Sequence, residues 1–98
     1  MKQREKTQES VIRREIRSDG ENEYCYELII KESQRVASYK IPLYSIRVGM
    51  KNEVSEYTEA EVKDVFADPG KAIVFFEKLI SNLATPIDLA YILEDEIS

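Results

Sequence analysis

The amino-acid sequence predicts an α+β protein with two layers, in which an antiparallel sheet of about four strands is followed by two C-terminal helices. Two observations predict this class. Apolar and polar residues alternate through much of residues 10–65, which is typical of strands with one face in water. Later, Asp68-Pro69 and Thr85-Pro86 each place a proline after a capping residue, and each opens an apolar stripe at helical spacing.

The composition is that of one small globular domain. With 98 residues, 43% of them hydrophobic, the chain can form one core, so we treat 1–98 as a single domain and expect the polar residues 1–9 to be flexible. The first residues are charged, and the single cysteine, Cys25, cannot form an internal disulfide. The apolar run at 72–76 is far shorter than the ~20 residues of a membrane span. These features predict a cytoplasmic protein.

The net charge of −5 is unevenly distributed. Residues 1–20 hold six basic and four acidic groups, giving +2, whereas residues 21–98 hold eight basic and fifteen acidic groups, giving −7. Non-specific nucleic-acid binding depends on neutralising phosphates, so an acidic body disfavours it. We therefore expect no nucleic-acid partner, and a contact through the basic N-terminal segment is the lesser alternative.

The first half of the chain contains a hairpin and a second strand. Residues 10–17 fit both a helix and a strand, but the turn dipeptide Asp19-Gly20, followed by an evident strand, favours a hairpin. The strand at 24–31 is the clearest in the chain, because every second residue on one face is large and apolar. These residues are Tyr24, Tyr26, Leu28 and Ile30.

The middle of the chain is expected to be more broken. Residues 32–34 read as a polar break, and Pro42, which has no N–H, splits the next stretch into a short piece at 36–41 and a strand at 43–50. A turn at 51–53 precedes a strand at 54–65 with acids on its outer face. Glu59 and Glu61 would repel each other there unless Arg47, on the presumed neighbouring strand, pairs with one of them.

The first helix is predicted over 69–83, with Asp68 as its cap. The high β propensity of residues 72–76 favours a strand instead, but the helical periodicity outweighs it. Val74 alone falls on the polar side of this helix. The expected buried stripe is Ile73, Phe76, Ile80 and Leu83, with Ala72, Phe75 and Leu79 beside it.

The second helix begins at Thr85-Pro86. Asp88, three residues after Thr85, completes a capping box with Asp in place of Glu. Two apolar stripes follow, and a helix that packs against both a sheet and another helix would use both. One stripe comprises Leu89, Ala90, Leu93 and Ile97, and the other comprises Ile87 and Tyr91.

Four segments together resemble a small bacterial family of uncharacterised single-domain proteins, a domain of unknown function. They are YCYELII, YSIRVGM, EVKDV and the ending TPIDLAYILEDEI. The resemblance covers about residues 10–98. It implies a strand-rich first half, a final Ser/Thr-Pro-Ile-x-Leu helix with an acidic tip, and a bacterial cytoplasmic origin. It implies no activity and no functional residues.

The chain offers little catalytic chemistry. It has no histidine, and Cys25 lies in a strand between two tyrosines, where we expect it to pack rather than react. The acidic segment 53–68 lacks the ligand spacing and turn glycine of a calcium loop. We therefore expect no catalytic residue, no metal and no cofactor, and predict a non-enzymatic regulatory or protein-interaction module. The alternative is an enzyme or small-ligand binder that uses carboxylates and tyrosines in a cleft between sheet and helices.

A candidate interaction surface follows from residues that the helical patterns leave unexplained. Four apolar ones would form an exposed patch that a protein partner or a second copy in a two-fold homodimer would cover. Three acids lie at the negative end of the last helix's dipole, which is unfavourable. A basic partner, such as Arg13-Arg14 of a second subunit, would offset this repulsion. The full set is Val74, Phe75, Ile87, Tyr91, Glu94, Asp95 and Glu96.

Overall fold

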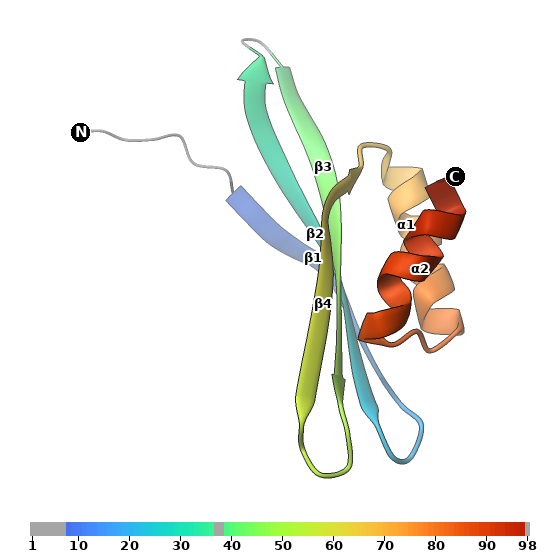
Figure 1. Ribbon diagram of the computed structural model, residues 1–98. Helices are drawn as coiled ribbons and strands as arrows, with labels where there is room; N and C mark the ends of the chain where they lie inside the picture. The colour runs from blue at the N-terminus through green and yellow to red at the C-terminus, as the bar shows by residue number, and fades with distance from the viewer. Residues whose placement is uncertain (1–7, 37–38, 98) are drawn as a thin grey trace, which may run out of the picture.

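The computed structural model describes residues 8–36 and 39–97 (Figure 1). Four antiparallel strands form one sheet in the order β1-β2-β3-β4, and both helices pack on the same face of it. The predicted α+β class is thereby confirmed. The elements are β1 (Gln8–Ser18), β2 (Glu23–Val36), β3 (Tyr39–Lys51), β4 (Tyr57–Phe66), α1 (Pro69–Ser81) and α2 (Pro86–Ile97).

The hairpin predicted for residues 10–17 is confirmed, since β1 pairs antiparallel with β2. Asp19 organises the turn, because its Oδ1 accepts hydrogen bonds from the N–H groups of Glu21 and Asn22 at 3.0 and 2.8 Å. Gly20 has a φ of 97°, a conformation that favours glycine. The expected flexibility of residues 1–9 falls mostly on 1–7, which lie outside the described residues, and the strand begins at Gln8.

The break expected at residues 32–34 and the split expected at Pro42 are both wrong. β2 continues to Val36, β3 runs from Tyr39 to Lys51, and Glu32 pairs with Pro42. The physical reason is the position of β4, which ends opposite Tyr44. Beyond that point β3 has a neighbour on one side only, where a residue without an N–H is tolerated. This end of the hairpin also extends past the helices (Figure 1), so it needs no apolar face.

β4 begins three residues later than expected, at Tyr57, because Asn52 holds a longer turn. Its Oδ1 accepts hydrogen bonds from the N–H groups of Val54 and Glu56 at 3.0 and 2.9 Å. Near its other end β4 bulges at Asp64, whose φ is 55°. The Asp64 N–H donates to Ser45 Oγ at 2.9 Å. The bulge lets Phe66 join the core between sheet and helices.

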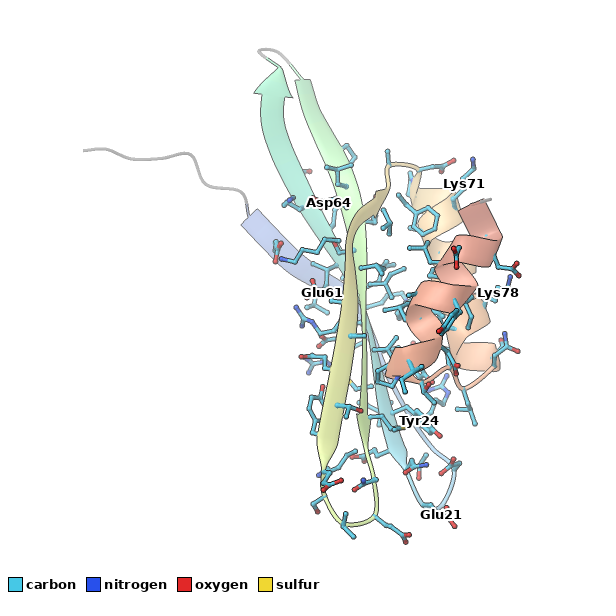
Figure 2. The ribbon with its side chains drawn as sticks, viewed as in Figure 1. Glu21, Tyr24, Glu61, Asp64, Lys71 and Lys78 are labelled. Carbon is cyan, nitrogen blue, oxygen red and sulfur yellow. The ribbon has the colours of Figure 1, made fainter. Side chains whose placement is uncertain are left out.

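The core lies between the sheet and the two helices. Alternate residues of β2 and β3 supply the sheet side, as the alternation predicted, and Tyr24 is one of them (Figure 2). The hydroxyl of Tyr26 donates to the carbonyl of Ala84 at 2.9 Å, and burial raises the pKa of Tyr26 to about 12. Tyr26 therefore acts as a packing residue whose one polar atom is satisfied. The fully buried large side chains are Tyr26, Phe75, Phe76, Leu28, Ile46, Leu79, Leu89, Val48 and Ser45.

The buried face predicted for α1 is correct for Phe76 and for the partly buried Ile80, but the observed face is rotated by about one residue. Ala72, Phe75, Phe76 and Leu79 are fully buried, whereas Ile73 and Leu83 are 39% and 37% exposed. The observed set also follows helical spacing, and it points both phenylalanines at the sheet. Leu83 cannot extend the stripe, because α1 ends at Ser81 and Leu83 has a φ of 49°. The predicted cap is present, since Asp68 Oδ1 accepts from the Gly70 N–H at 2.9 Å.

The capping box of α2 is confirmed in both directions. The Thr85 N–H donates to Asp88 Oδ2 at 3.0 Å, and the Asp88 N–H donates to Thr85 Oγ1 at 3.3 Å. The expected core stripe is correct for Leu89 and for Leu93, which is partly buried against the core, but not for Ala90, which is exposed. Pro86, the first residue of α2, is buried instead, so the start of the helix packs toward the sheet. The side chain of Ile97 lies outside the described part of the chain.

Candidate interaction surface

The outer face of α2 carries the most exposed large apolar side chains of the helix layer. Ile87 and Tyr91 lie one turn apart and are 76% and 68% exposed. Glu94 and Asp95 continue the same face and are also exposed. We call these four residues the α2 stripe. It points away from the core because Pro86 and Leu89 hold the opposite side of the helix against the sheet.

A small hollow adjoins the first turn of α2. Its volume is about 390 Å³, and Ile87 forms part of its wall. The floor comes from β3 and β4, mainly from Met50, Thr58 and Ala60, which alternate toward the helices. The α2 stripe is therefore a ridge beside a depression, which can contact a partner more closely than a flat surface can. The hollow is lined by Met50, Thr58, Glu59, Ala60, Thr85, Pro86 and Ile87.

A larger hollow of about 880 Å³ lies where β4, α1 and the end of α2 meet. Val74, the apolar residue on the polar side of α1, is 63% exposed and forms part of the wall of this hollow. Lys71 and Glu96 bring one charge of each sign to its wall. Figure 2 shows Lys71 and Lys78 on the helix layer. The remaining lining residues are Val65, Phe66, Ala67, Asp68 and Gly70.

The expected surface residues separate into three groups. Phe75 is fully buried and packs against Phe66 with ring centroids 5.4 Å apart, so its assignment to the surface is wrong. The cause is the rotation of α1 described above. Val74 lines the larger hollow, whereas Ile87 and Tyr91 lie on the α2 stripe. The four apolar residues therefore do not form one patch.

The three acids of the last helical turn also differ from one another. Glu96 Oε1 accepts from Lys78 Nζ at 3.1 Å, so a base on α1 compensates it. Among the described residues, the ion pairs include Glu96 but neither Glu94 nor Asp95. These two acids therefore supply the negative charge that the α2 stripe presents to a partner.

The helix-free face of the sheet carries a row of charges, which we call the charge row: Arg14, Glu27, Arg47, Glu59 and Glu61. Glu27 is only 6% exposed, yet it accepts from Arg14 Nε at 2.9 Å and from Arg47 Nη1 at 2.6 Å. Burial by itself would raise the pKa of Glu27, but the hydrogen bonds from Arg14 and Arg47 outweigh it, so the net pKa is lowered.

The expected pairing of Arg47 with the β4 acids is confirmed, since its Nε lies 3.6 Å from an oxygen of both Glu59 and Glu61. Glu61 and Asp64 lie on this side of the sheet in Figure 2. Nearby, Tyr57 lies across Gly49, and its hydroxyl occupies the space that a side chain at Gly49 would need. These long side chains bury the face, although neither α1 nor α2 covers it.

Cys25, on this face, lacks the surroundings of an activated thiol. Cys25 is half-buried, and burial raises the pKa of its thiol, whereas an activated thiol needs a lowered one. Among residues 8–36 and 39–97, no group of three or more acidic or cysteine side chains could hold a metal ion.

The model of the Family of unknown function (DUF6514) matches residues 5–98. The chain belongs to this family. The DUF6514 match spans every described strand and helix, so the sheet and both helices belong to one family unit. Comparison of the DUF6514 chain with curated proteins and with solved structures found no match. Of the described helices, none is long and apolar enough to cross a membrane.

Sequence reasoning found the α2 stripe in this DUF6514 chain but missed what surrounds it. The helical spacing of Ile87 and Tyr91 was sufficient to separate them from the core stripe. The hollow beside Ile87 depends on how α2 sits over β3 and β4, and no local pattern contains that. The Glu27 ion pairs had a usable signal, because the pairing of β1 and β3 with β2 places Arg14 and Arg47 directly opposite Glu27.

Proposed function

We propose that this DUF6514 protein is a small non-enzymatic, regulatory protein-interaction module of the bacterial cytoplasm, and that the α2 stripe binds a partner chain with apolar and basic side chains. The observation that carries the proposal is the 76% and 68% exposure of Ile87 and Tyr91 on one helix face. Covering two such side chains contributes roughly 1.5–3 kcal/mol each, which is substantial for a small interface.

The charge of the stripe selects the partner's chemistry. Glu94 and Asp95 are exposed acids near the negative end of the α2 dipole. Basic groups of a partner would offset both the charge of these acids and their unfavourable interaction with the dipole. A second copy docked on the same face would bring only acids and apolar groups to this surface. The stripe therefore fits a different, basic chain better than a homodimer, and Arg13 and Arg14 already bind acids of their own chain.

The cellular setting of the proposal has separate support. The resemblance of the sequence to a bacterial family supports the bacterial origin, and Cys25, the chain's single cysteine, suits a reducing compartment.

The proposal is tested by capture from the native cell extract with matched variants. The immobilised chain should retain a discrete protein that is lost with Ile87→Ser and with Tyr91→Ser. Val54→Ser is the control, because Val54 is 70% exposed but lies in the turn between β3 and β4. Equal retention by wild type and both α2 variants would contradict the proposal.

A second candidate function is small-ligand binding in the larger hollow. Its volume of about 880 Å³ falls within the usual range for small-molecule sites, and its walls combine apolar side chains with Lys71 and Glu96. Fragment screening by NMR would test this. Perturbed amide signals at residues 65–74 that Val74→Trp abolishes would support a ligand site, and a library without such hits would argue against it.

A further inference from the structure

We propose that β1 is a self-association edge, and that the β1 strands of two copies pair antiparallel to make one continuous eight-stranded sheet. β1 is the terminal strand, and in the described part of the chain no strand pairs with its outer side. An edge strand presents unpaired N–H and C=O groups that another strand can satisfy. The helices pack mainly on the other strands, α1 over β2, β3 and β4 and α2 over β3 and β4. α1 reaches β1 through the side chain of Arg13, which binds Glu77.

β1 carries three half-exposed apolar side chains among its polar ones. Val11, Ile12 and Ile16 are 46%, 46% and 50% exposed. Val11 pairs with Ile29 and Ile16 with Cys25, so both point to the helix-free face, and alternation with Ile16 places Ile12 there too. Natural edges are usually protected by charged residues, and three half-exposed aliphatic side chains on one edge indicate a contact.

One register makes this edge complementary to its own copy. If Arg14 lies opposite Arg14 of the second copy, Ile12 lies opposite the second copy's Ile16, and Arg13 lies opposite its Glu15. A two-fold axis repeats each pair, so the helix-free face gains a strip of four isoleucines and the helix face gains two ion pairs. The central arginines are drawn apart, because each guanidinium binds its own Glu27. Ile12 is itself the bulged residue of β1, without a partner on β2, and it stands at the end of this paired segment.

The charge pattern favours a second copy over another occupant. The segment Arg13–Ile16 carries both signs, so it can satisfy itself, unlike the acidic α2 stripe. Arg13 already pairs with Glu77 and Glu15, at 3.0 and 3.1 Å, and Glu15 of the second copy would join this cluster. The inference uses the opposite side of the molecule from the proposed function and does not depend on it.

Sedimentation equilibrium of the full chain tests the association. The monomer mass is 11.4 kDa, and we expect twice that mass at micromolar concentration. Ile16→Asp should return the monomer mass, because it places two charges in the apolar strip, while circular dichroism confirms that the variant is folded. Tyr91→Lys, on the α2 stripe, should leave the dimer mass unchanged. A wild-type monomer, or a dimer that survives Ile16→Asp and is lost with Tyr91→Lys, would overturn the proposal.

Cysteine cross-linking tests the register. In a Cys25→Ser background, oxidising a mixture of Ile12→Cys and Ile16→Cys chains should form an intermolecular disulfide, because directly opposite residues are within disulfide range. Neither variant should cross-link alone, since equal positions would be four residues, or about 13 Å, apart along the strand. Equal cross-linking of each variant alone and of the mixture would reject this register. A Val54→Cys chain, with its cysteine in a distant exposed turn, controls for random collision.

Discussion

The two faces of the sheet are both buried at their centre, but by different means. On the helix side, Tyr26, Leu28 and Val48 have no exposed surface because α1 and α2 cover them. On the other side, no element among the described residues covers the sheet, yet Glu27, Ile29 and Ser45 are only 6%, 2% and 2% exposed. There, long side chains lie flat across their neighbours, and ion pairs between adjacent strands hold them in place.

The difference shows that burial and hydrophobicity are separate properties in this fold. The helix side gains stability from apolar area removed from water. The helix-free side gains it from a carboxylate held between two guanidinium groups, and so depends on pH and on the pairing of strands. The α2 stripe is the exposed face of the helix layer, and the β1 edge is the end of the sheet next to the charge row.

The largest effect should come from the helix side. Phe75→Ala should lower the free energy of unfolding by roughly 3–5 kcal/mol, because Phe75 has no exposed surface and its removal leaves a cavity. Ile73→Ala should cost no more than about 1–2 kcal/mol, because 39% of that residue is already in water. Urea unfolding of both variants measures the difference. A larger loss for Ile73 would restore the helix face expected from the sequence.

The helix-free side should respond to pH. Glu27→Gln should destabilise by about 1–3 kcal/mol at pH 7, because it removes the charged acceptor of two guanidinium groups. Since the folded pKa of Glu27 is below its ordinary 4.5, its contribution is present above that pH and is lost as the pH falls through the folded value. Urea unfolding should therefore show a smaller gap between wild type and variant near pH 3. A gap that is constant with pH would refute the ion-pair explanation.

The capping box should give a smaller effect. Thr85→Ala should lower the free energy of unfolding by about 0.5–2 kcal/mol, because the Asp88 N–H then loses its bond to Thr85 Oγ1. Thr85→Ser keeps the hydroxyl and should cost much less. Thermal or urea unfolding of both variants decides the matter, and equal losses would show that the methyl group is what matters.

The smallest effect should come from the covering of Gly49. Tyr57→Ala should change the free energy of unfolding by less than about 1 kcal/mol, because Tyr57 is 56% exposed. It should nevertheless speed the reaction of Cys25 with a thiol reagent, since Gly49, directly opposite Cys25, loses its cover. Val54→Ala is the control. An unchanged labelling rate would mean that Tyr57 does not shield this part of the sheet.

Local patterns could predict the elements of this fold but not its packing angles. Alternation placed Tyr24 to Ile30 correctly, and the capping chemistry at Asp68 and Thr85 placed both helix starts. The buried face of α1 could not be predicted exactly. Ala72 and Ile73 each begin an apolar stripe at helical spacing, and which stripe is buried depends on how the helix packs on the sheet. Pro42 was expected to interrupt its strand. Whether a proline does so depends on whether a strand pairs with it on both sides, and here that is set by where β4 ends, which the local sequence does not contain. At the candidate surface, helical spacing predicted the exposure of Ile87 and Tyr91, but it did not predict the burial of Phe75.

The most direct test of the proposed function places a photoreactive phenylalanine analogue at position 91 in the native cell. The account predicts a discrete cross-linked species from position 91 that is absent when the same analogue stands at position 54. It also predicts that Glu94→Lys with Asp95→Lys reduces the yield, because the partner is basic. Cross-linking that is absent at position 91, or identical at both positions, would contradict the claim that the α2 stripe binds a specific partner.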